Sequence, residues 1–369
     1  MASSESSSGA GSDGTAVAVV AGAARATRAG RVRLEGLARD LFGDDGVRID
    51  EARRTRIRAV LADLIQTIEG RMRRDLLLRL AADVPADVLM MLGNMTVAVA
   101  QPLLDGEGDR RVDHALVAVL ARRVDEHRLV VQARTAMAQD PDLVERPLLA
   151  GLAGHDDRGV AAAARAMIEC EAGRQARFDE PVLPLEDLPA AVRARLTWRV
   201  AAAVRRWIAR QHVPAAAVID RAVAAVAGGL LATAAEVPDH DAVAIGLARA
   251  MLRTGLADDA GTVAFAVEGH VAAAVAGLAL RAGIGMDAAW DMVLDPDGAR
   301  LLVLLRAAGI DRAAAAALIL RWPDGAASFD AIGDRMAAYD ALSVGAAQDA
   351  IDLYRLDPAY VAALEAAAR

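Results

Sequence analysis

The chain has 369 residues and a formal net charge of −8, and 55% of its residues are hydrophobic while only 3% are aromatic. The negative balance argues against a nucleic-acid-binding protein, which normally carries a positive field, and the single cysteine, Cys170, excludes a disulfide framework or a cysteine-based metal cluster. An apolar content made up mostly of alanine, valine and leucine favours packed helices, and we expect a protein of the reducing cytoplasm.

The sequence predicts little structure at the N-terminal end. Residues 1–14 are mostly glycine and serine and are expected to form a disordered tail. This stretch has no positively charged segment of the kind that opens a signal peptide. Elsewhere, the longest uncharged runs, such as residues 222–235, are shorter than the roughly 20 residues of a membrane span, so no membrane contact is expected.

Residues 15–178 are expected to form an N-terminal domain of helices. A long helix from Ile49 onwards carries one apolar stripe, in which hydrophobic residues recur three or four positions apart. The stripe consists of Ile57, Val60, Leu61, Leu64 and Ile68. Beyond Arg74 the predicted helices become short and paired.

An eight-residue phrase of the form V-x-x-P-L-L-x-G occurs twice in this domain, at residues 99–106 and 144–151, with an offset of 45 residues. A helical unit that recurs at about 40–47 residues is typical of HEAT and armadillo solenoids. Each phrase ends in a glycine, Gly106 or Gly151, which is expected to close a helix. The pattern therefore predicts stacked antiparallel helix pairs.

A segment rich in prolines and acids, residues 179–189, is expected to be a linker, because a regular helix does not readily pass through three prolines. It precedes a C-terminal helical domain over residues 190–369. In that domain a glycine followed by an apolar residue ends three predicted helices, which is typical of a Schellman stop. These pairs are Gly255-Leu256, Gly283-Ile284 and Gly309-Ile310.

The helix predicted over residues 190–211 carries the strongest candidate for a binding surface. Its apolar residues fall on one side, and four arginines fall within about 60° of one another on the other side. These are Arg195, Arg199, Arg206 and Arg210. No acid occurs between Asp187 and Asp220, and guanidinium groups suit the carboxylates or phosphates of a partner. The alternatives are a solvated helix face, or ion pairs with acids of a neighbouring helix.

Two His-Asp dipeptides, His155-Asp156 and His240-Asp241, are the one pattern that could hold a divalent metal ion. Both precede predicted helices, where an acid also interacts favourably with the helix dipole, so helix capping is the competing interpretation. The sequence contains no P-loop, G-x-S-x-G or H-E-x-x-H motif. Trp198 and Trp207 are predicted on opposite sides of their helix, which does not make a stacking platform for bases.

Three short apolar stretches carry a resemblance to a known family. They are residues 77–81 (LLRLA), 97–104 (VAVAQPLL) and 302–309 (LVLLRAAG). With them, residues from about 70 to 355 resemble a bacterial family of all-helical, HEAT-like repeat proteins catalogued only as a domain of unknown function. The resemblance implies a helical-repeat fold and supplies no catalytic residue.

The sequence as a whole predicts an all-α protein, a HEAT-like helical-repeat solenoid of stacked antiparallel helix pairs with a helical C-terminal half. We expect a non-catalytic scaffold or regulatory adaptor whose partner is another protein, acidic or phosphorylated, bound on the extended surface of the repeats. No cofactor, nucleic acid or membrane is expected, and self-association is left open. The alternative is a metal-dependent enzyme that uses the His-Asp pairs, and a DNA-binding helical module is a third function that the net charge disfavours.

Overall fold

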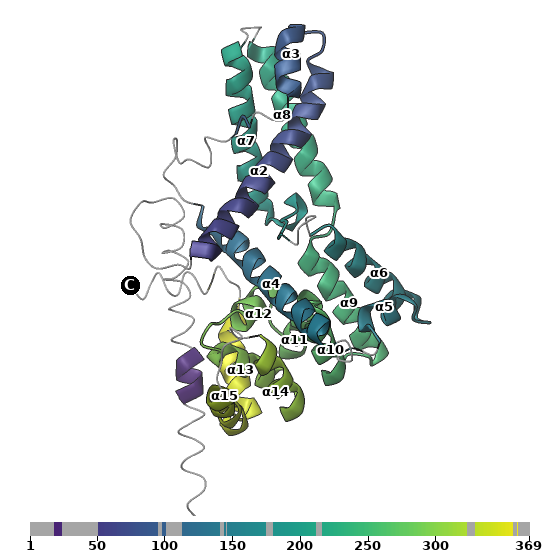
Figure 1. The fold of residues 1–369 in the computed structure, drawn as a ribbon, viewed down its shortest axis with the longest axis vertical. Coiled ribbons are helices and arrows are strands. Elements are labelled where there is room, and N and C mark those ends of the chain that lie inside the picture. Colours follow the sequence, from purple (N-terminus) through teal and green to yellow (C-terminus); the bar gives the residue numbers. More distant parts are fainter. Residues whose placement is uncertain are drawn as a thin grey trace, which may run out of the picture. The chain divides into compact units, whose positions relative to one another are not determined.

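The computed structural model describes residues 18–23, 51–94, 98–100, 113–140, 144, 146–174, 180–211, 216–322, 329–356 and 360. Over these ranges the chain forms helices and no β-strand, which confirms the predicted all-α class (Figure 1). The α-helices, in chain order, are α2 (Glu51–Arg79), α3 (Ala86–Gly93), α4 (His114–Gln139), α5 (Leu148–Ala153), α6 (Arg158–Ala172), α7 (Ala190–Gln211), α8 (Ala216–Glu236), α9 (His240–Thr254), α10 (Asp259–Glu268), α11 (Val271–Ala282), α12 (Met286–Val293), α13 (Ala299–Ala307), α14 (Arg312–Arg321), α15 (Phe329–Ala341) and α16 (Val344–Ile351).

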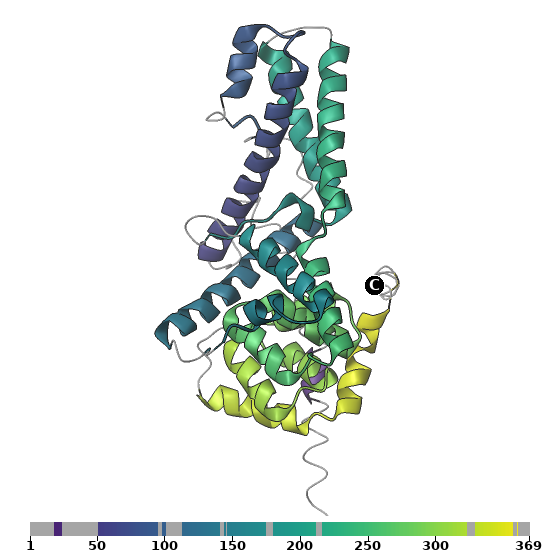
Figure 2. The ribbon, with the colours of Figure 1, turned by 90° about the vertical axis from the view of Figure 1, so that its right-hand side faces the viewer.

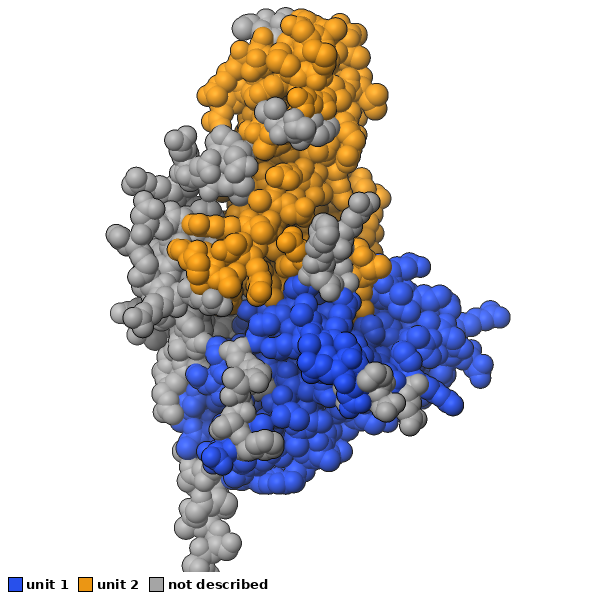
Figure 3. Space-filling view, in the orientation of Figure 1, with its two compact units in different colours: residues 1–33, 125–170, 240–369 blue, residues 34–124, 171–239 orange. Residues whose placement is uncertain are grey.

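The chain divides into two compact units, and each unit is assembled from separate stretches of sequence (Figure 3). Unit 1 comprises residues 1–33, 125–170 and 240–369, and unit 2 comprises residues 34–124 and 171–239. The linker predicted at residues 179–189 therefore falls within unit 2. The predicted domains, which follow one another along the chain, do not coincide with these units. Within each unit, helices that are distant in sequence pack around the same apolar core.

In unit 2, α2 packs against α7 and α8 (Figures 1 and 2). The apolar stripe predicted for α2 is buried: Ile57 and Ile68 have no exposed area, and Leu64 is 1% exposed. Val200 and Val204 of α7 are fully buried in the same core. The helical period of the sequence thus identifies the packed side of these helices correctly.

The expected linker is a packed part of unit 2 over residues 180–189. Its prolines do prevent a long helix, and only the 3₁₀ turn η3 (Leu185–Asp187) forms there. However, the leucines between the prolines are buried in the core, namely Leu183, Leu185 and Leu188. The Val182 N–H also donates to the carbonyl of Arg174 at 3.1 Å. These apolar anchors hold the segment in place although it is not helical.

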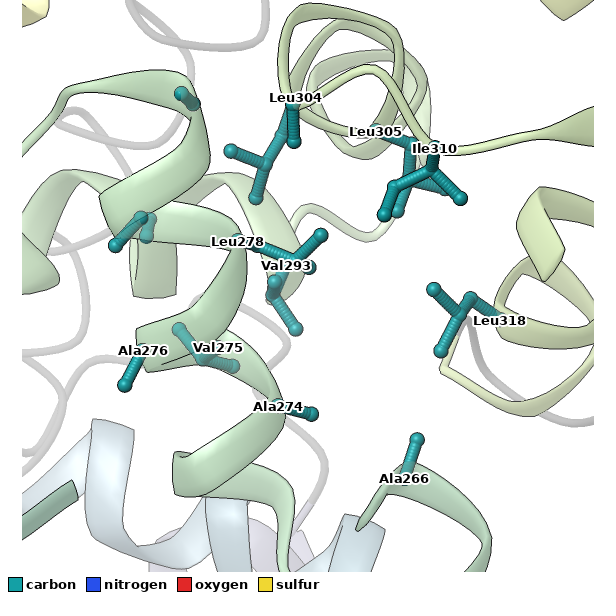
Figure 4. Close-up of a cluster of buried hydrophobic side chains, with 14 of the residues drawn as sticks. Ala266, Ala274, Val275, Ala276, Leu278, Val293, Leu304, Leu305, Ile310 and Leu318 are labelled. Carbon is teal, nitrogen blue, oxygen red and sulfur yellow. The ribbon is translucent and has the colours of Figure 1, made fainter. Parts of the chain in front are cut away.

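In unit 1, α11 is buried around most of its circumference, and α9, α10, α12 and α13 pack against it. Small side chains such as Ala274 and Ala276 let these neighbours approach, while Val275 and Leu278 fill the space between helices (Figure 4). A helix that is apolar on all sides is stable only inside a core, where no face meets water. α11 is therefore the central helix of this unit.

The three predicted glycine stops in unit 1 are confirmed. Their glycines have φ values of 73°, 70° and 68°, the left-handed region that a side chain disfavours. The N–H of the following residue reaches back five positions in each case, as a Schellman motif requires. These bonds are Leu256 to Met251 at 2.9 Å, Ile284 to Ala279 at 3.0 Å and Ile310 to Leu305 at 3.1 Å. A fourth stop of this kind, Gly269-His270, was not predicted because its second residue is polar.

The repeated phrase is only partly described by the structure. Residues 101–106 of its first copy lie outside the described residues. In the second copy Pro147 precedes α5, and Leu149 is buried. The expectation for Gly151 is wrong: this glycine lies inside α5, and Gly154 follows the helix end instead. The helix start in the second copy is as predicted.

By length and composition, one helical run among the described residues could cross a membrane. A window of 18 residues within Ala216–Thr254 has a mean hydropathy of 1.5, and 22% of that window is buried. The prediction from the sequence considered only uncharged runs and therefore did not identify this window, because a membrane-spanning window can contain up to two charged residues. Core helices of globular proteins pass the same test, so this property by itself assigns no location.

One carboxylate and one guanidinium group join several helix ends in unit 1. Asp259 accepts hydrogen bonds from Arg281 Nη1 at 2.5 Å and from the Asp311 N–H at 2.7 Å. Arg281 also donates to the carbonyls of Ala308 and Gly309. Burial alone would raise the pKa of Asp259, but the donors of Asp311 and Arg281 together hold this pKa below its usual value.

We expect Asp259→Asn to lower the free energy of unfolding by about 1–2 kcal/mol at pH 7, because a charged hydrogen-bond acceptor is lost. A lowered pKa in the folded state stabilises the protein above the unfolded pKa of about 3.9, and this contribution disappears as the pH falls through the folded pKa. The difference between wild type and variant should therefore shrink between about pH 5 and pH 3. Urea unfolding followed by circular dichroism at pH 7, pH 5 and pH 3 measures this difference in unfolding free energy. Asp349→Asn, at an exposed position, is the control.

Candidate functional site

The exposed side of α7 carries the arginines singled out in the sequence. The opposite side of this helix is buried, with Leu196, Val200 and Ile208 in the core of unit 2. Arg195, Arg206 and Arg210 are exposed, and Arg199 is half-buried. The hydrophobic period of α7 therefore decides which side chains are presented to solvent.

Arg195, unlike the other three arginines, forms an ion pair within the described part of the chain. Its Nε and Nη2 atoms donate to the two carboxylate oxygens of Asp113 at 2.9 Å and 3.0 Å. This bidentate geometry is the strong form of an arginine–carboxylate pair, and it neutralises the guanidinium charge. The alternative of an ion pair with a neighbouring element is thus correct for Arg195.

The remaining three residues form what we call the arginine strip: Arg199, Arg206 and Arg210. At 100° per residue their directions lie within about 40° of one another, and at 1.5 Å per residue they span roughly 16 Å of helix. Over the residues described, none of the three forms an ion pair or hydrogen bond with another side chain or carbonyl. The strip is therefore a concentration of positive charge that faces solvent.

Other arginines of the chain have an evident structural role, because they close the C-terminal ends of helices. Arg73 donates to the carbonyl of Leu92 at 2.7 Å, Arg165 to that of Ala153 at 2.7 Å, and Arg306 to that of Leu342 at 2.6 Å. A cation at this position satisfies carbonyls that have no partner within the helix. The arginine strip has no such acceptor among the described residues, which distinguishes it from these arginines.

An exposed tryptophan lies at one edge of the exposed side of α7. Trp198 is 44% exposed, and its direction is about 80° from that of Arg206, about 100° from that of Arg199 and about 120° from that of Arg210. Trp207, on the opposite side, is half-buried and packs against the core. The helical period also predicts that Trp198 faces solvent, a signal that a test for base stacking alone overlooks. Aromatic and arginine side chains are both enriched at protein interfaces.

The first His-Asp dipeptide serves the start of α6. The Asp157 N–H donates to His155 Nδ1 at 3.0 Å, and Asp157 Oδ1 accepts from the Val160 N–H at 2.9 Å. Asp157 is thus the residue that caps the helix, which is the role weighed against metal binding. Asp156 is exposed and lies just before it.

The second His-Asp dipeptide lies at the start of α9. His240 is buried, and its Nδ1 lies 3.6 Å from Glu126 Oε1, while Asp241 Oδ1 accepts from Trp290 Nε1 at 3.3 Å. Within the described part of the chain, no group of three or more His, Cys, Asp or Glu side chains could hold a metal ion. In this part of the chain, side chains of both dipeptides thus make contacts within the fold.

The match to known protein families agrees with the resemblance seen in the sequence. Residues 99–352 match the family described as "Uncharacterised protein conserved in bacteria (DUF2336)". Searches of the curated proteins and of the solved structures found no match. The matched stretch covers more than half of the chain and includes α7 with its arginine strip, and the protein belongs to this bacterial family.

Proposed function

We propose that this protein is a non-catalytic adaptor that binds an acidic or phosphorylated segment of another protein on the exposed side of α7. The observation that carries the proposal is the arginine strip. Three like charges on one helix face repel one another and contribute nothing to the fold when no acid lies beside them. Carboxylates or phosphates of a partner would relieve this repulsion and accept bidentate hydrogen bonds from the guanidinium groups.

Trp198 supports a protein partner over a small anion. A free phosphate would need only the guanidinium groups, whereas a peptide can also cover an exposed aromatic side chain. Ala202 is exposed between Arg199 and Arg206, and its short side chain leaves room for an extended segment beside the guanidinium groups. Arg205 pairs with Asp220 at 2.7 Å, so it contributes packing more than free charge.

The proposal includes a HEAT-like stacking of the helix pairs and a cytoplasmic location. The recurring glycine stops after α9, α11 and α13 support the stacking, since they end every second helix of this stretch in the same way. In the proposed stack α11 is the central helix of unit 1, in keeping with its burial on most sides. The acidic composition and single cysteine support the location.

The test is a triple charge reversal, Arg199→Glu, Arg206→Glu and Arg210→Glu, in the full-length chain. We expect a partner captured from native extract by wild-type protein, and identified by mass spectrometry, to bind at least about thirtyfold more weakly, because attraction becomes repulsion at the centre of the surface. Binding should also weaken as the salt concentration rises. Isothermal titration with the purified partner measures the affinity.

A matched control separates a specific surface from an effect of net charge. Arg56, Arg74 and Arg79 are exposed on α2, so reversing these three charges changes the net charge by the same amount. We expect this control to retain binding within about threefold, since long-range charge affects association weakly at physiological salt. Equal losses in both triple variants, or unchanged capture by the α7 variant, would remove the arginine strip from the proposal.

A further inference from the structure

The exposed side of α8 carries a row of small apolar residues with few charges among them. Its buried side packs on α2 and α7 through Ile219, Val223 and Val226. The small residues that are exposed or half-buried on the other side are Ala217, Ala224, Ala225, Gly228, Gly229, Ala232 and Ala235, and the exposed Arg221 and half-buried Leu231 lie among them. A Cβ atom added to Gly228 or Gly229 would meet nothing within 4 Å, so the space in front of both glycines is open. An apolar helix side of this kind favours contact with another surface over contact with water.

Two opposite charges bracket this surface. Arg221 and Glu236 are both exposed, and their directions on α8 differ by about 60°. They are too far apart along the helix, roughly 22 Å, to pair with each other. Neither forms an ion pair with another described residue. The midpoint between them falls between Gly228 and Gly229.

We propose that α8 pairs with α8 of a second copy of this chain, in antiparallel orientation, about a twofold axis between Gly228 and Gly229. This arrangement places Arg221 opposite Glu236 of the second copy, and the twofold axis repeats that ion pair at the other end. Ala225 then faces Ala232, and the two glycines meet at the crossing point. A twofold interface must be complementary to itself, and α8 meets this condition in both charge and side-chain size.

The size of the residues at the crossing decides how close the helices can come. Glycine and alanine at four-residue spacing let two helix backbones approach until dispersion contacts form along them. Other occupants match the surface less well. A bilayer would have to accommodate Arg221 and Glu236 at its margins, and an acidic peptide would match only the arginine end. A second copy satisfies both charges with the same contact.

The full-length chain tests this by sedimentation velocity between about 1 and 100 µM. A crossing of two helices buries less area than the roughly 1,200–2,000 Å² of a standard interface, so a dimer that dissociates in this range is expected. Gly228→Leu should abolish the dimer because its side chain holds the backbones apart. It should leave the fold intact, since the position is open and leucine favours a helix. Gly345→Leu is the matched control, because Gly345 is also helical and also has no neighbour within 4 Å of an added Cβ atom, although it is exposed where Gly228 is half-buried.

Charge exchange identifies the orientation. Arg221→Glu and Glu236→Arg should each weaken self-association by roughly tenfold or more, because both equivalent pairs become repulsive. A mixture of the two single variants should form a mixed dimer, and the double exchange should restore self-association. Restoration cannot come from a contact within one chain, given the separation of the two residues along the helix.

Three results would overturn the proposal. The first is a wild-type chain that sediments as a monomer at 100 µM. The second is a dimer that persists in Gly228→Leu. The third is a monomer that floats with neutral phosphatidylcholine vesicles, which would assign the α8 surface to a bilayer. None of these results bears on the arginine strip, so the two proposals fail separately.

Discussion

Replacing Glu69 by alanine is expected to lower the free energy of unfolding by about 3–5 kcal/mol, because it leaves a buried guanidinium group without its counter-charge. Glu69 is 3% exposed and Arg73 is 1% exposed, and Arg73 Nη1 donates to Glu69 Oε1 at 2.7 Å. The carboxylate also accepts from the N–H groups of Val99 and Ala100, at 2.9 Å and 2.8 Å. The substitution therefore removes the acceptor for three buried donors at once.

The position of Arg73 explains why this loss should be large. Arg73 holds the end of α3 through the carbonyls of Leu92 and Asn94, so it cannot turn away to solvent without releasing that helix. Urea unfolding followed by circular dichroism measures the effect. Glu69→Gln keeps the shape and one acceptor but not the charge, and should lose less than Glu69→Ala. A loss below about 1 kcal/mol in Glu69→Ala would contradict the assigned role of this pair.

Replacing Trp290 by alanine is expected to cost about 3–5 kcal/mol of unfolding free energy, because it opens a large cavity in the core of unit 1. Trp290 lies on α12 and is 1% exposed, with Ala289 and Val293 buried beside it on the same helix. The neighbouring Ala289 has a short side chain that cannot extend to fill the space. The same denaturation experiment applies, with thermal unfolding as a second measurement.

Two further tryptophan variants separate packing from hydrogen bonding. Trp290→Phe keeps most of the aromatic volume but loses the donor to Asp241 Oδ1, so we expect a smaller loss of about 1–2 kcal/mol. Trp198→Ala removes a tryptophan that is 44% exposed, and should change stability by no more than about 0.5 kcal/mol. An equal effect of Trp198→Ala and Trp290→Ala would contradict the burial that separates them.

Much of the local structure follows from neighbouring residues. The stripe of α2 is visible because apolar side chains recur at the helical period, and its members are buried. The stops at Gly255, Gly283 and Gly309 are visible because a left-handed glycine followed by an apolar residue is a local requirement of the Schellman motif. Gly269 has the same geometry, and it escaped prediction because His270 replaces the usual apolar residue.

The organisation into units depends on contacts that short-range patterns do not contain. Three leucines between the prolines of residues 180–189 are buried, although the composition of the segment resembles a linker. Glu268 illustrates the same limit. Its carboxylate accepts from the Leu148 N–H at 2.7 Å and holds the start of α5, although the two residues are 120 positions apart. No sequence pattern near Glu268 or Leu148 predicts this hydrogen bond.

At the candidate site, some features can be predicted from the sequence and others require the three-dimensional structure. An all-α chain, the buried and exposed sides of α7, and the four arginines on its exposed side can be predicted from composition and the helical period. The neutralisation of Arg195 depends on the three-dimensional fold, because its partner Asp113 lies 82 residues away. The fold also separates Arg199, Arg206 and Arg210 from the arginines that close helix ends. The physical reason is that a charge is cancelled by what lies within a few ångströms in space, which the order of residues along a chain does not specify.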